Sequence, residues 1–345
     1  MKFLSRRNLL GAGILCAAVL AFLPGRSFEQ PVTPLPATAP EAAATENCKV
    51  GIYIVDLHDL DISKKLFDAN FWVWSQCKRE SLTPLKTMEF VNANRSSGAL
   101  DQMQNRDGIY WSARKIDGTF RHDWNVGNFP FDRHVMRISL EEGMDDGRTF
   151  RYEPDLPASG YDRRIVLPGW KLEGFRLLSS TRHYETTFGD PTLTHETPAE
   201  YSRLDAEIIV SRASLTSFVK MTSAVYVAAT LALLSFLFHL DSASSFSSRI
   251  SFLAGSLFAT VVNMRVASSE LGSNDGLTLI DNIHITVLFL VIAATVLTIL
   301  ADRRMRKGKA DSIRHFDRVN MAWCAALFVT ANAVLIGMAV LAERA

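Results

Sequence analysis

The uneven distribution of charged side chains along this 345-residue chain constrains its fold more than any other feature. Residues 48–212 hold 47 charged side chains in 165 positions, whereas residues 213–345 hold 19 in 133 positions. The whole-chain total of 37 basic and 36 acidic residues conceals this division. Because this total is nearly balanced, the chain is not a strongly basic nucleic-acid-binding protein. The sequence therefore predicts two parts that fold in different solvents, with a boundary near residue 212.

Four apolar segments follow this boundary. Residues 217–240, 283–301 and 319–342 are each long and apolar enough to span a bilayer. The remaining segment, 246–270, is similar in length but contains Ser251, Ser256, Thr260, Asn263 and Arg265. Lipid disfavours such a helix because a charge at membrane depth is costly, so it belongs in a protein interior or along a water-filled path. Residues 213–345 are thus predicted to form a four-helix transmembrane domain.

The charges between these segments predict their orientation. Seven basic residues lie between Arg303 and Arg318, a loop that should face the cytoplasm. The loop before the third span contains Glu270, Asp275 and Asp281 but no lysine or arginine, as is typical of the outer side. We expect a multi-pass protein of the bacterial inner membrane, with residues 48–212 in the periplasm.

The amino terminus is consistent with export. Residues 1–27 resemble a signal peptide, because a basic start containing Arg6 and Arg7 precedes the apolar stretch Leu9–Leu23. Residues 28–47 are rich in proline and alanine and are predicted to form a linker.

Two cysteines flank an expected hairpin. Strands over residues 49–55 and 67–76 that turn near residues 62–63 would place Cys48 opposite Cys77. A disulfide there fits an oxidising periplasm, and two free thiols are the alternative.

Residues 48–212 show the pattern of a β-sandwich. We find no amphipathic helix of normal length, and turn residues separate short alternating or aromatic runs. The expected strands are Val50–Val55, Asn70–Trp74, Met88–Asn92, Gly108–Arg114, Val135–Leu140, Trp170–Leu178 and Ala206–Val210. Motifs of hydrolases, P-loop proteins and zinc proteases are absent from the sequence, so we expect neither an enzyme nor a cofactor or metal requirement.

Four short motifs, in this order along the chain, resemble the pentameric ligand-gated ion channels. They are Pro84 with Phe90-Val91-Asn92-Ala93, the loop Phe129-Pro130-Phe131-Asp132-Arg133, Ser245-Phe246-Ser247-Ser248-Arg249-Ile250, and Leu277-Thr278-Leu279-Ile280-Asp281. The resemblance covers residues 48–342. It departs from the family at the first span, which lacks a proline, and at Ser247 and Ser248, where cation-selective relatives have a glutamate.

The resemblance implies an all-β, immunoglobulin-like periplasmic sandwich followed by an all-α four-helix transmembrane bundle. Such a chain would assemble with four further copies of itself, in membrane lipid, as a homopentamer around a central pore for permeating ions. Its function would be ligand-gated ion conduction, with an unknown small molecule or a proton as agonist. The alternative is a non-conducting, membrane-anchored receptor on the same scaffold.

The resemblance also implies which residues line the pore. They are Ser251, Gly255, Phe258, Val262, Arg265 and Ser269. Helical periodicity alone favours a different stripe, Ser256, Thr260 and Asn263, which either faces a neighbouring subunit or marks a rotated pore. Arg249 at the inner mouth and the ring of Arg265 would disfavour cations, although Glu270 could neutralise Arg265.

The expected gating interface joins the proline loop to the end of the last strand. By resemblance, Asp132 pairs with Arg212 and with an acid of the first hairpin, Asp59 or Asp61. A purely structural salt bridge is the alternative for these charges. The remaining members of this predicted interface are Pro130, Phe131 and Asp281.

Ligand contacts are expected among aromatic side chains on two sides of a subunit interface. One side comprises Trp72, Trp74, Tyr110 and Trp111, and the other comprises Phe150, Tyr152, Tyr184 and Tyr201. Aromatic residues in a sandwich also serve as core, which is the alternative for each of them. Glu185, Glu196 and Glu200 offer titratable groups for proton gating.

Overall fold

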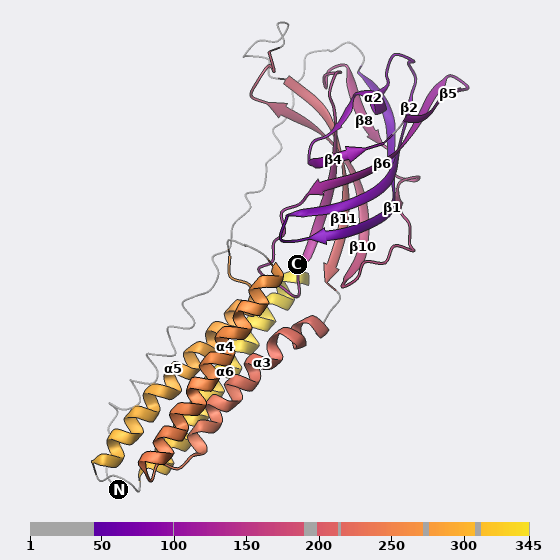
Figure 1. Ribbon diagram of the computed structural model, residues 1–345. Helices are drawn as coiled ribbons and strands as arrows, with labels where there is room; N and C mark the ends of the chain where they lie inside the picture. The colour runs from indigo at the N-terminus through magenta and orange to yellow at the C-terminus, as the bar shows by residue number, and fades with distance from the viewer. Residues whose placement is uncertain are drawn as a thin grey trace. The chain divides into compact units, whose positions relative to one another are not determined.

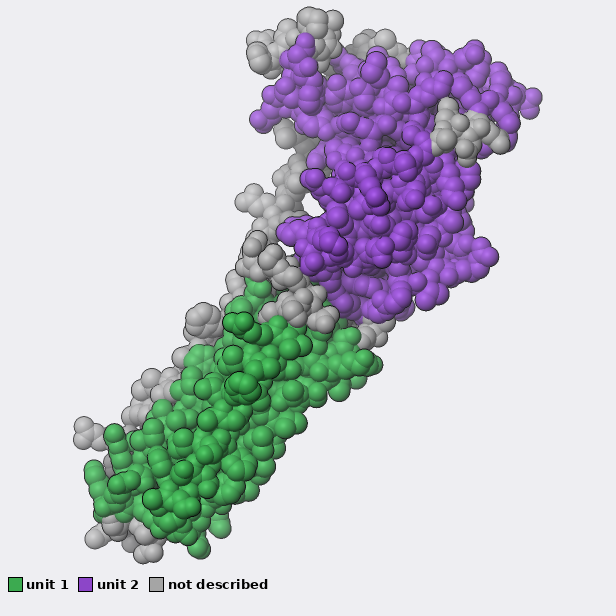
Figure 2. Space-filling view, viewed as in Figure 1, with its two compact units in different colours: residues 1–29, 125–132, 214–345 green, residues 30–124, 133–213 purple. Residues whose placement is uncertain are grey.

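The computed structural model describes residues 45–98, 100–189, 199–212, 215–271, 276–307 and 312–344. These residues belong to two compact units (Figure 2), each described here by itself. Residues 45–124 and 133–212 form the sheet unit, and residues 125–132 and 215–344 form the helical unit. The predicted export signal, 1–27, and most of the predicted linker lie outside the described residues.

The sheet unit contains two β-sheets (Figure 1). The larger sheet has seven strands. Five of them follow the order β4, β6, β2, β1, β8, and in addition β5 pairs with β6 and β9 pairs with β1. The smaller sheet has four strands in the order β10, β11, β7, β3. The strands of the larger sheet are β1 (Glu46–Asp61), β2 (Leu66–Cys77), β4 (Ala93–Ser97), β5 (Leu100–Arg106), β6 (Ile109–Arg121), β8 (Phe150–Pro154) and β9 (Gly160–Tyr161). Those of the smaller sheet are β3 (Met88–Phe90), β7 (Arg133–Glu142), β10 (Trp170–Tyr184) and β11 (Ala199–Arg212), and one helical turn, α2 (Pro84–Thr87), precedes β3.

Alternation of buried and less buried side chains along the strands creates the core of this unit. In β2 every second residue from Phe67 to Cys77 is buried, because successive side chains point to opposite faces of a sheet. Phe90 of the smaller sheet has its ring 5.7 Å from that of Phe71 and 5.8 Å from that of Phe120, both in the larger sheet. The two sheets therefore share one apolar core.

The predicted disulfide is confirmed. β1 and β2 are antiparallel, and their register pairs Lys49 with Gln76, so Cys48 lies opposite Cys77. The two sulfur atoms are bonded, with 4.6 Å between the Cα atoms, and both cysteines are buried. The bond holds together the two ends of a hairpin that turns at residues 62–65.

The helical unit contains four helices long and apolar enough to cross a membrane. They are α3 (Leu215–Leu234), which continues into the 3₁₀ turn η2 (Ser235–Leu237), α4 (Ala243–Leu271), α5 (Leu279–Arg306) and α6 (Ile313–Arg344). All four predicted spans are present. The first ends at Leu237, before the predicted bound at residue 240, whereas α4, α5 and α6 extend beyond the predicted apolar segments. Polar caps and basic ends account for the extra turns, which hydropathy does not detect.

The start of α5 shows how a cap extends a helix. Thr278 and Asp281 form a capping box, in which the Asp281 amide donates to Thr278 Oγ1 at 3.1 Å and the Thr278 amide donates to Asp281 Oδ2 at 2.9 Å. These bonds satisfy backbone donors that the first turn of a helix leaves without partners. The helix therefore begins at Leu279, four residues before the predicted apolar run.

Candidate functional site

The polar stripe of α4 faces the other helices of its own chain. Ser256 and Thr260 are fully buried, and each hydroxyl donates to the carbonyl four residues earlier, at 2.9 and 2.7 Å. The Asn263 amide donates to the carbonyl of Met221 on α3 at 2.9 Å, and its Nδ2 lies 2.9 Å from His284 Nε2 on α5. Periodicity predicted that this stripe faces a neighbouring subunit or a rotated pore; it is instead internal to the single chain, where it attaches α4 to α3 and α5.

A different face of α4 is exposed in the single chain. Phe258 is 73% exposed and Val262 is 45% exposed. Ser251, Gly255 and Arg265 are exposed as well. These five are the residues that the resemblance assigns to a pore, and the structure brings them onto one free face. The side chains of Ser269 and Glu270 lie outside the described residues.

The expectation for Arg249 is wrong. Arg249 is fully buried between the helices, with Nη2 2.5 Å from Asp317 Oδ2 on α6 and Nη1 3.2 Å from Asp317 Oδ1. Its Nε also donates to the carbonyl of Phe238 at 2.8 Å, just after η2. A guanidinium presents five donors in a fixed fork, and here it joins the start of α4, the end of η2 and the first turns of α6. Its charge is therefore neutralised inside the bundle instead of lying at an inner mouth.

The proline loop belongs to the helical unit. Residues 125–132 include a cis Phe129–Pro130 peptide, and both of these residues are buried. The Gly127 carbonyl accepts from the amide of Leu279 at 2.9 Å, and the Phe131 ring lies 5.4 Å from the Phe218 ring of α3. The loop thus contacts the first turns of α3 and α5, and Asp281 of the same region belongs to the capping box of α5.

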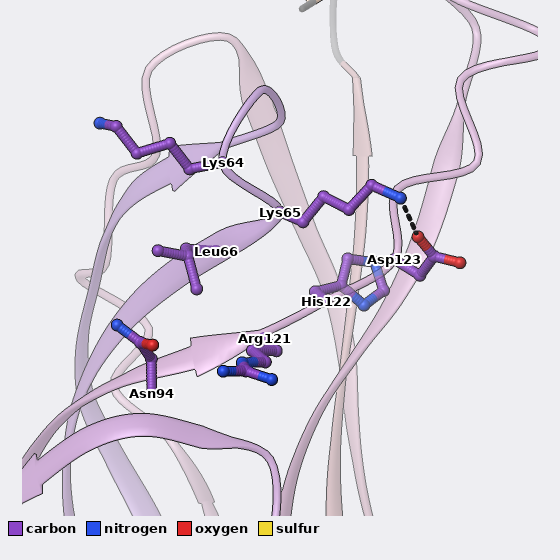
Figure 3. Close-up of a pocket in the computed structure, with 7 residues that line it drawn as sticks. All are labelled: Lys64, Lys65, Leu66, Asn94, Arg121, His122 and Asp123. Atoms are coloured by element: carbon purple, nitrogen blue, oxygen red, sulfur yellow. Dashed lines mark hydrogen bonds and ion pairs between the residues drawn. The ribbon is translucent and has the colours of Figure 1, made fainter. Parts of the chain in front are cut away.

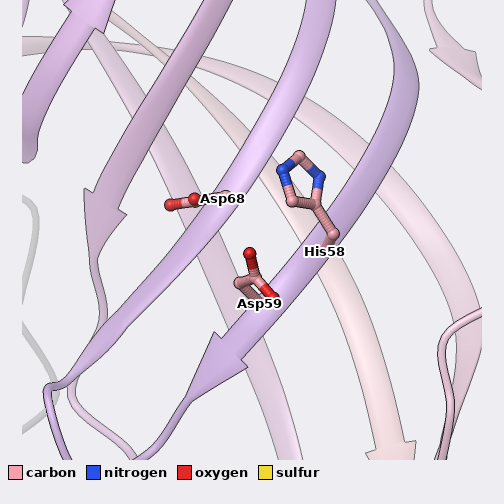
Figure 4. A group of neighbouring side chains, drawn as sticks. All are labelled: His58, Asp59 and Asp68. Carbon is pink, nitrogen blue, oxygen red and sulfur yellow. The ribbon is translucent and has the colours of Figure 1, made fainter.

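Asp59, Asp61 and Arg212, which are also predicted gating residues, belong to the sheet unit. Asp61 Oδ2 accepts from Lys64 Nζ at 2.8 Å, and this bond lowers the pKa of the Asp61 carboxyl. Asp59 lies beside His58 and Asp68 (Figure 4). The expected pairing of Asp132 with Arg212 would join the two units and stays a prediction.

Arg212 packs against a cluster of aromatic and histidine rings that the sequence does not reveal. Its guanidinium lies over the Trp170 ring, 4.2 Å from the centroid, in cation–π geometry. The Trp124 ring lies 5.5 Å from that of Trp170, and it meets the rings of His122 and His134 at 4.6 and 4.9 Å. These residues come from four separate parts of the chain, so no local spacing indicates the group. It ties the last residue of β11 to the core of the sheet unit.

His122 also lines a basic hollow of about 460 Å³ (Figure 3). The other lining residues are Lys64, Lys65, Leu66, Asn94, Arg121 and Asp123. Lys65 Nζ is 3.0 Å from Asp123 Oδ1. Burial, together with the nearby His134 ring, lowers the pKa of His122 to about 4. The imidazole is therefore neutral near pH 7, and the hollow draws its positive charge from lysine and arginine.

Three of the predicted ligand residues line one cavity on the outer face of the larger sheet. Trp72 and Trp74 of β2 and Trp111 of β6 line it together with Tyr53 of β1, and its volume is about 520 Å³. Trp72 and Trp74 are two residues apart on one strand and so project from the same face. The Trp74 indole donates to Asp155 Oδ2 at 3.0 Å, which fixes one wall of the cavity.

The other predicted ligand residues divide into three groups. Phe150 and Tyr152 are buried and contact each other at 5.0 Å between ring centroids, so they serve as core. Tyr110 lies outside the cavity lining, and its hydroxyl donates to Glu80 at 3.4 Å. Tyr184 and Tyr201 lie 6.1 Å apart between centroids.

The hairpin that carries Tyr184 and Tyr201 has a third aromatic residue, Phe188. Its ring lies 5.2 Å from that of Tyr184 and 6.1 Å from that of Tyr201, and the residue is 61% exposed. An exposed phenylalanine in a turn has no periodic signal, so sequence analysis misses it. Glu185 and Glu200 lie on the same hairpin, and Glu196 lies outside the described residues.

Comparison of the chain with known protein families and with characterised proteins finds no match.

Proposed function

We propose that this protein is a subunit of a homopentameric ligand-gated ion channel of the bacterial inner membrane. In this proposal the sheet unit is an immunoglobulin-like sandwich in the periplasm, and α4 of each of five copies lines the pore. The sequence motifs listed by residue above support the family, and the β-domain followed by four membrane-length helices is compatible with it.

The observation that carries this proposal is the division of α4 into two faces. Ser256 and Thr260 are buried inside the single chain and the Asn263 amide is bonded there, whereas Phe258, Val262 and Arg265 are exposed. An exposed arginine on a membrane helix is costly in lipid, so this face requires either water or another protein surface. A water-filled axis shared by five copies meets this requirement.

Assembly of five copies around one axis gives each exposed residue of this α4 face a role. Five copies of Phe258 and Val262 would form apolar constrictions that close by dewetting, with Ser251 as a polar ring towards the cytoplasm. Because Asp317 neutralises Arg249, Arg265 is the cation left on this face among the described side chains of α4. We infer an anion-permeable or weakly selective pore, to be tested by the reversal potential in a chloride gradient at constant cation concentration.

The aromatic cavity of the sheet unit is the proposed ligand site. Indole faces attract cations through the ring quadrupole, and three indoles line this cavity; the Asp155 carboxylate in its lining is already paired with Lys49 at 3.2 Å. We infer that the agonist carries a positively charged nitrogen on an apolar body. The hairpin with Tyr184, Phe188 and Tyr201 would close such a site from a neighbouring copy.

Current measurement on the purified protein in a planar bilayer tests this proposal. We expect current from the wild-type protein, and easier opening of Phe258→Ala because the apolar constriction is lost. Val262→Ala should act in the same direction, whereas Val261→Ala is a matched control with 44% exposure against 45% for Val262. A pentamer that binds a ligand but passes no current in any variant would favour the non-conducting receptor.

A further inference from the structure

The β1–β2 hairpin carries a group of three side chains of metal-ligating type, of which Asp59 is also a predicted gating residue. Ligand atoms of His58, Asp59 and Asp68 all lie within 4.8 Å of one another (Figure 4). We propose that these three residues bind a first-row divalent cation such as Zn²⁺.

The strand pairing explains how the three side chains meet. His58 of β1 lies directly opposite Asp68 of β2, and the next ladder pair is Asp61 with Leu66. Two residues of β1 thus oppose the single residue Phe67, which makes a β-bulge. Neighbouring side chains of a regular strand point to opposite faces, but Asp59 has φ of 49°, and this irregular backbone lets its carboxylate approach the imidazole.

The donor atoms select the class of metal. One imidazole nitrogen and two carboxylate oxygens are typical of zinc and neighbouring transition metals, and water can supply a fourth ligand. Calcium and magnesium prefer sites made wholly of oxygen atoms. The mixed donor set therefore favours Zn²⁺ over Ca²⁺.

The local charge is negative and lacks a bonded cation. Among the described residues, neither Asp59 nor Asp68 forms an ion pair with a lysine or arginine. Lys64 of the same hairpin donates to Asp61 instead. Two carboxylates this close repel each other, and a divalent cation between them removes that repulsion.

A further carboxylate supports the imidazole. Asp56 Oδ2 lies 3.5 Å from His58 Nδ1, at ion-pair distance. We therefore assign metal binding to the other ring nitrogen, Nε2. Carboxylates in this supporting position orient the ring of metal-binding histidines and raise their affinity.

Isothermal titration of the full-length protein in detergent, without a polyhistidine tag, tests the site with ZnCl₂ alone. We expect saturable binding of one Zn²⁺ per chain and a raised midpoint of thermal unfolding. His58→Ala and Asp68→Asn should each weaken this binding by more than about tenfold, and Asp56→Asn by about tenfold. CaCl₂ in place of ZnCl₂ should bind far more weakly.

His183→Ala is the matched control, because His183 also pairs with a carboxylate, Glu200, at 2.9 Å but is not in a three-ligand group. It should leave the affinity unchanged. Absence of saturable Zn²⁺ binding would overturn the proposal, and so would wild-type affinity in His58→Ala or Asp68→Asn. Each variant is first shown to be folded by its circular dichroism. Because the readout is metal binding, it is independent of whether the protein conducts ions.

Discussion

The guanidinium of Arg249 and the carboxylate of Asp317 form an ion pair inside the helical unit, with 2.5 Å between Nη2 and Oδ2. The two residues lie 68 positions apart, on α4 and α6. Removing one member of a buried pair leaves the other charge without its counterion. This pair should therefore be among the most sensitive points of the bundle.

Asp317→Asn is expected to destabilise the helical unit by about 3 kcal/mol. Asp302→Asn is the matched control, because Asp302 pairs with Arg306 near the exposed end of α5, and such pairs contribute only about 0.3–0.5 kcal/mol. The measurement is the midpoint of thermal unfolding in detergent, followed by circular dichroism. Equal shifts for the two variants would contradict a stabilising role for the buried pair.

Loss of the disulfide should destabilise the sheet unit. Bridging cysteines 29 positions apart contributes about 3–4 kcal/mol in the chain-entropy model, so Cys48→Ala with Cys77→Ala should lower its unfolding midpoint. Tryptophan fluorescence reports this selectively, since five of the six tryptophans lie in that unit and only Trp323 lies in α6. Cys324→Ala, which removes a buried cysteine outside the disulfide, should leave this transition in place. Alkylation of Cys48 and Cys77 without prior reduction would disprove the bond.

The buried His122 side chain should make the sheet unit less stable in acid. Its pKa is about 4 in the folded chain against an ordinary value of 6.5, because burial disfavours the charged ring. The unfolded chain therefore binds a proton first as the pH falls. The stabilising contribution is present above pH 6.5 and is lost progressively between pH 6.5 and pH 4, by up to about 3 kcal/mol.

The comparison of wild type with His122→Asn isolates this contribution from other titrating groups. Between pH 7 and pH 4 the unfolding midpoint of the sheet unit should fall more steeply in the wild type than in the variant. Parallel curves would show that His122 does not control this pH dependence.

The capping box predicts that Thr278 stabilises the start of α5. Thr278→Ala removes the acceptor for the Asp281 amide and should cost about 1 kcal/mol. Thr295→Ala, within the same helix, is the control, because the Thr295 hydroxyl donates to a carbonyl already bonded within the helix. The measurement is the midpoint of thermal unfolding of the helical unit in detergent. Equal shifts of this midpoint in the two variants would argue against the cap.

Sequence patterns predicted the local features of this fold well. Hydropathy found the four membrane-length helices, and strand length with cysteine position found the Cys48–Cys77 bond. Turn residues and alternation also located the principal strands of the sheet unit. All of these depend on spacing within one or two neighbouring elements, which the sequence displays directly.

Features that depend on distant partners were not predictable in this way. Arg249 is expected at an inner mouth until Asp317 is placed beside it, and Tyr152 is a candidate ligand contact until the parallel pairing of β8 with β1 places it in the core. The polar stripe Ser256, Thr260 and Asn263 resembles a water-lined face, yet its hydroxyls are satisfied within the helix and its amide by α3. Periodicity shows that a helix has a polar face but not which neighbour covers it.

The central claim is that the exposed face of α4 lines an ion-conducting pore. The most direct measurement is the rate at which a charged thiol reagent changes the current through single-cysteine variants in a planar bilayer. Gly255→Cys, Phe258→Cys and Val262→Cys should be modified rapidly with a change in current, whereas Ser256→Cys and Thr260→Cys should be protected. Protection of the first three with modification of the other two, or no current from any of these proteins, would contradict the claim.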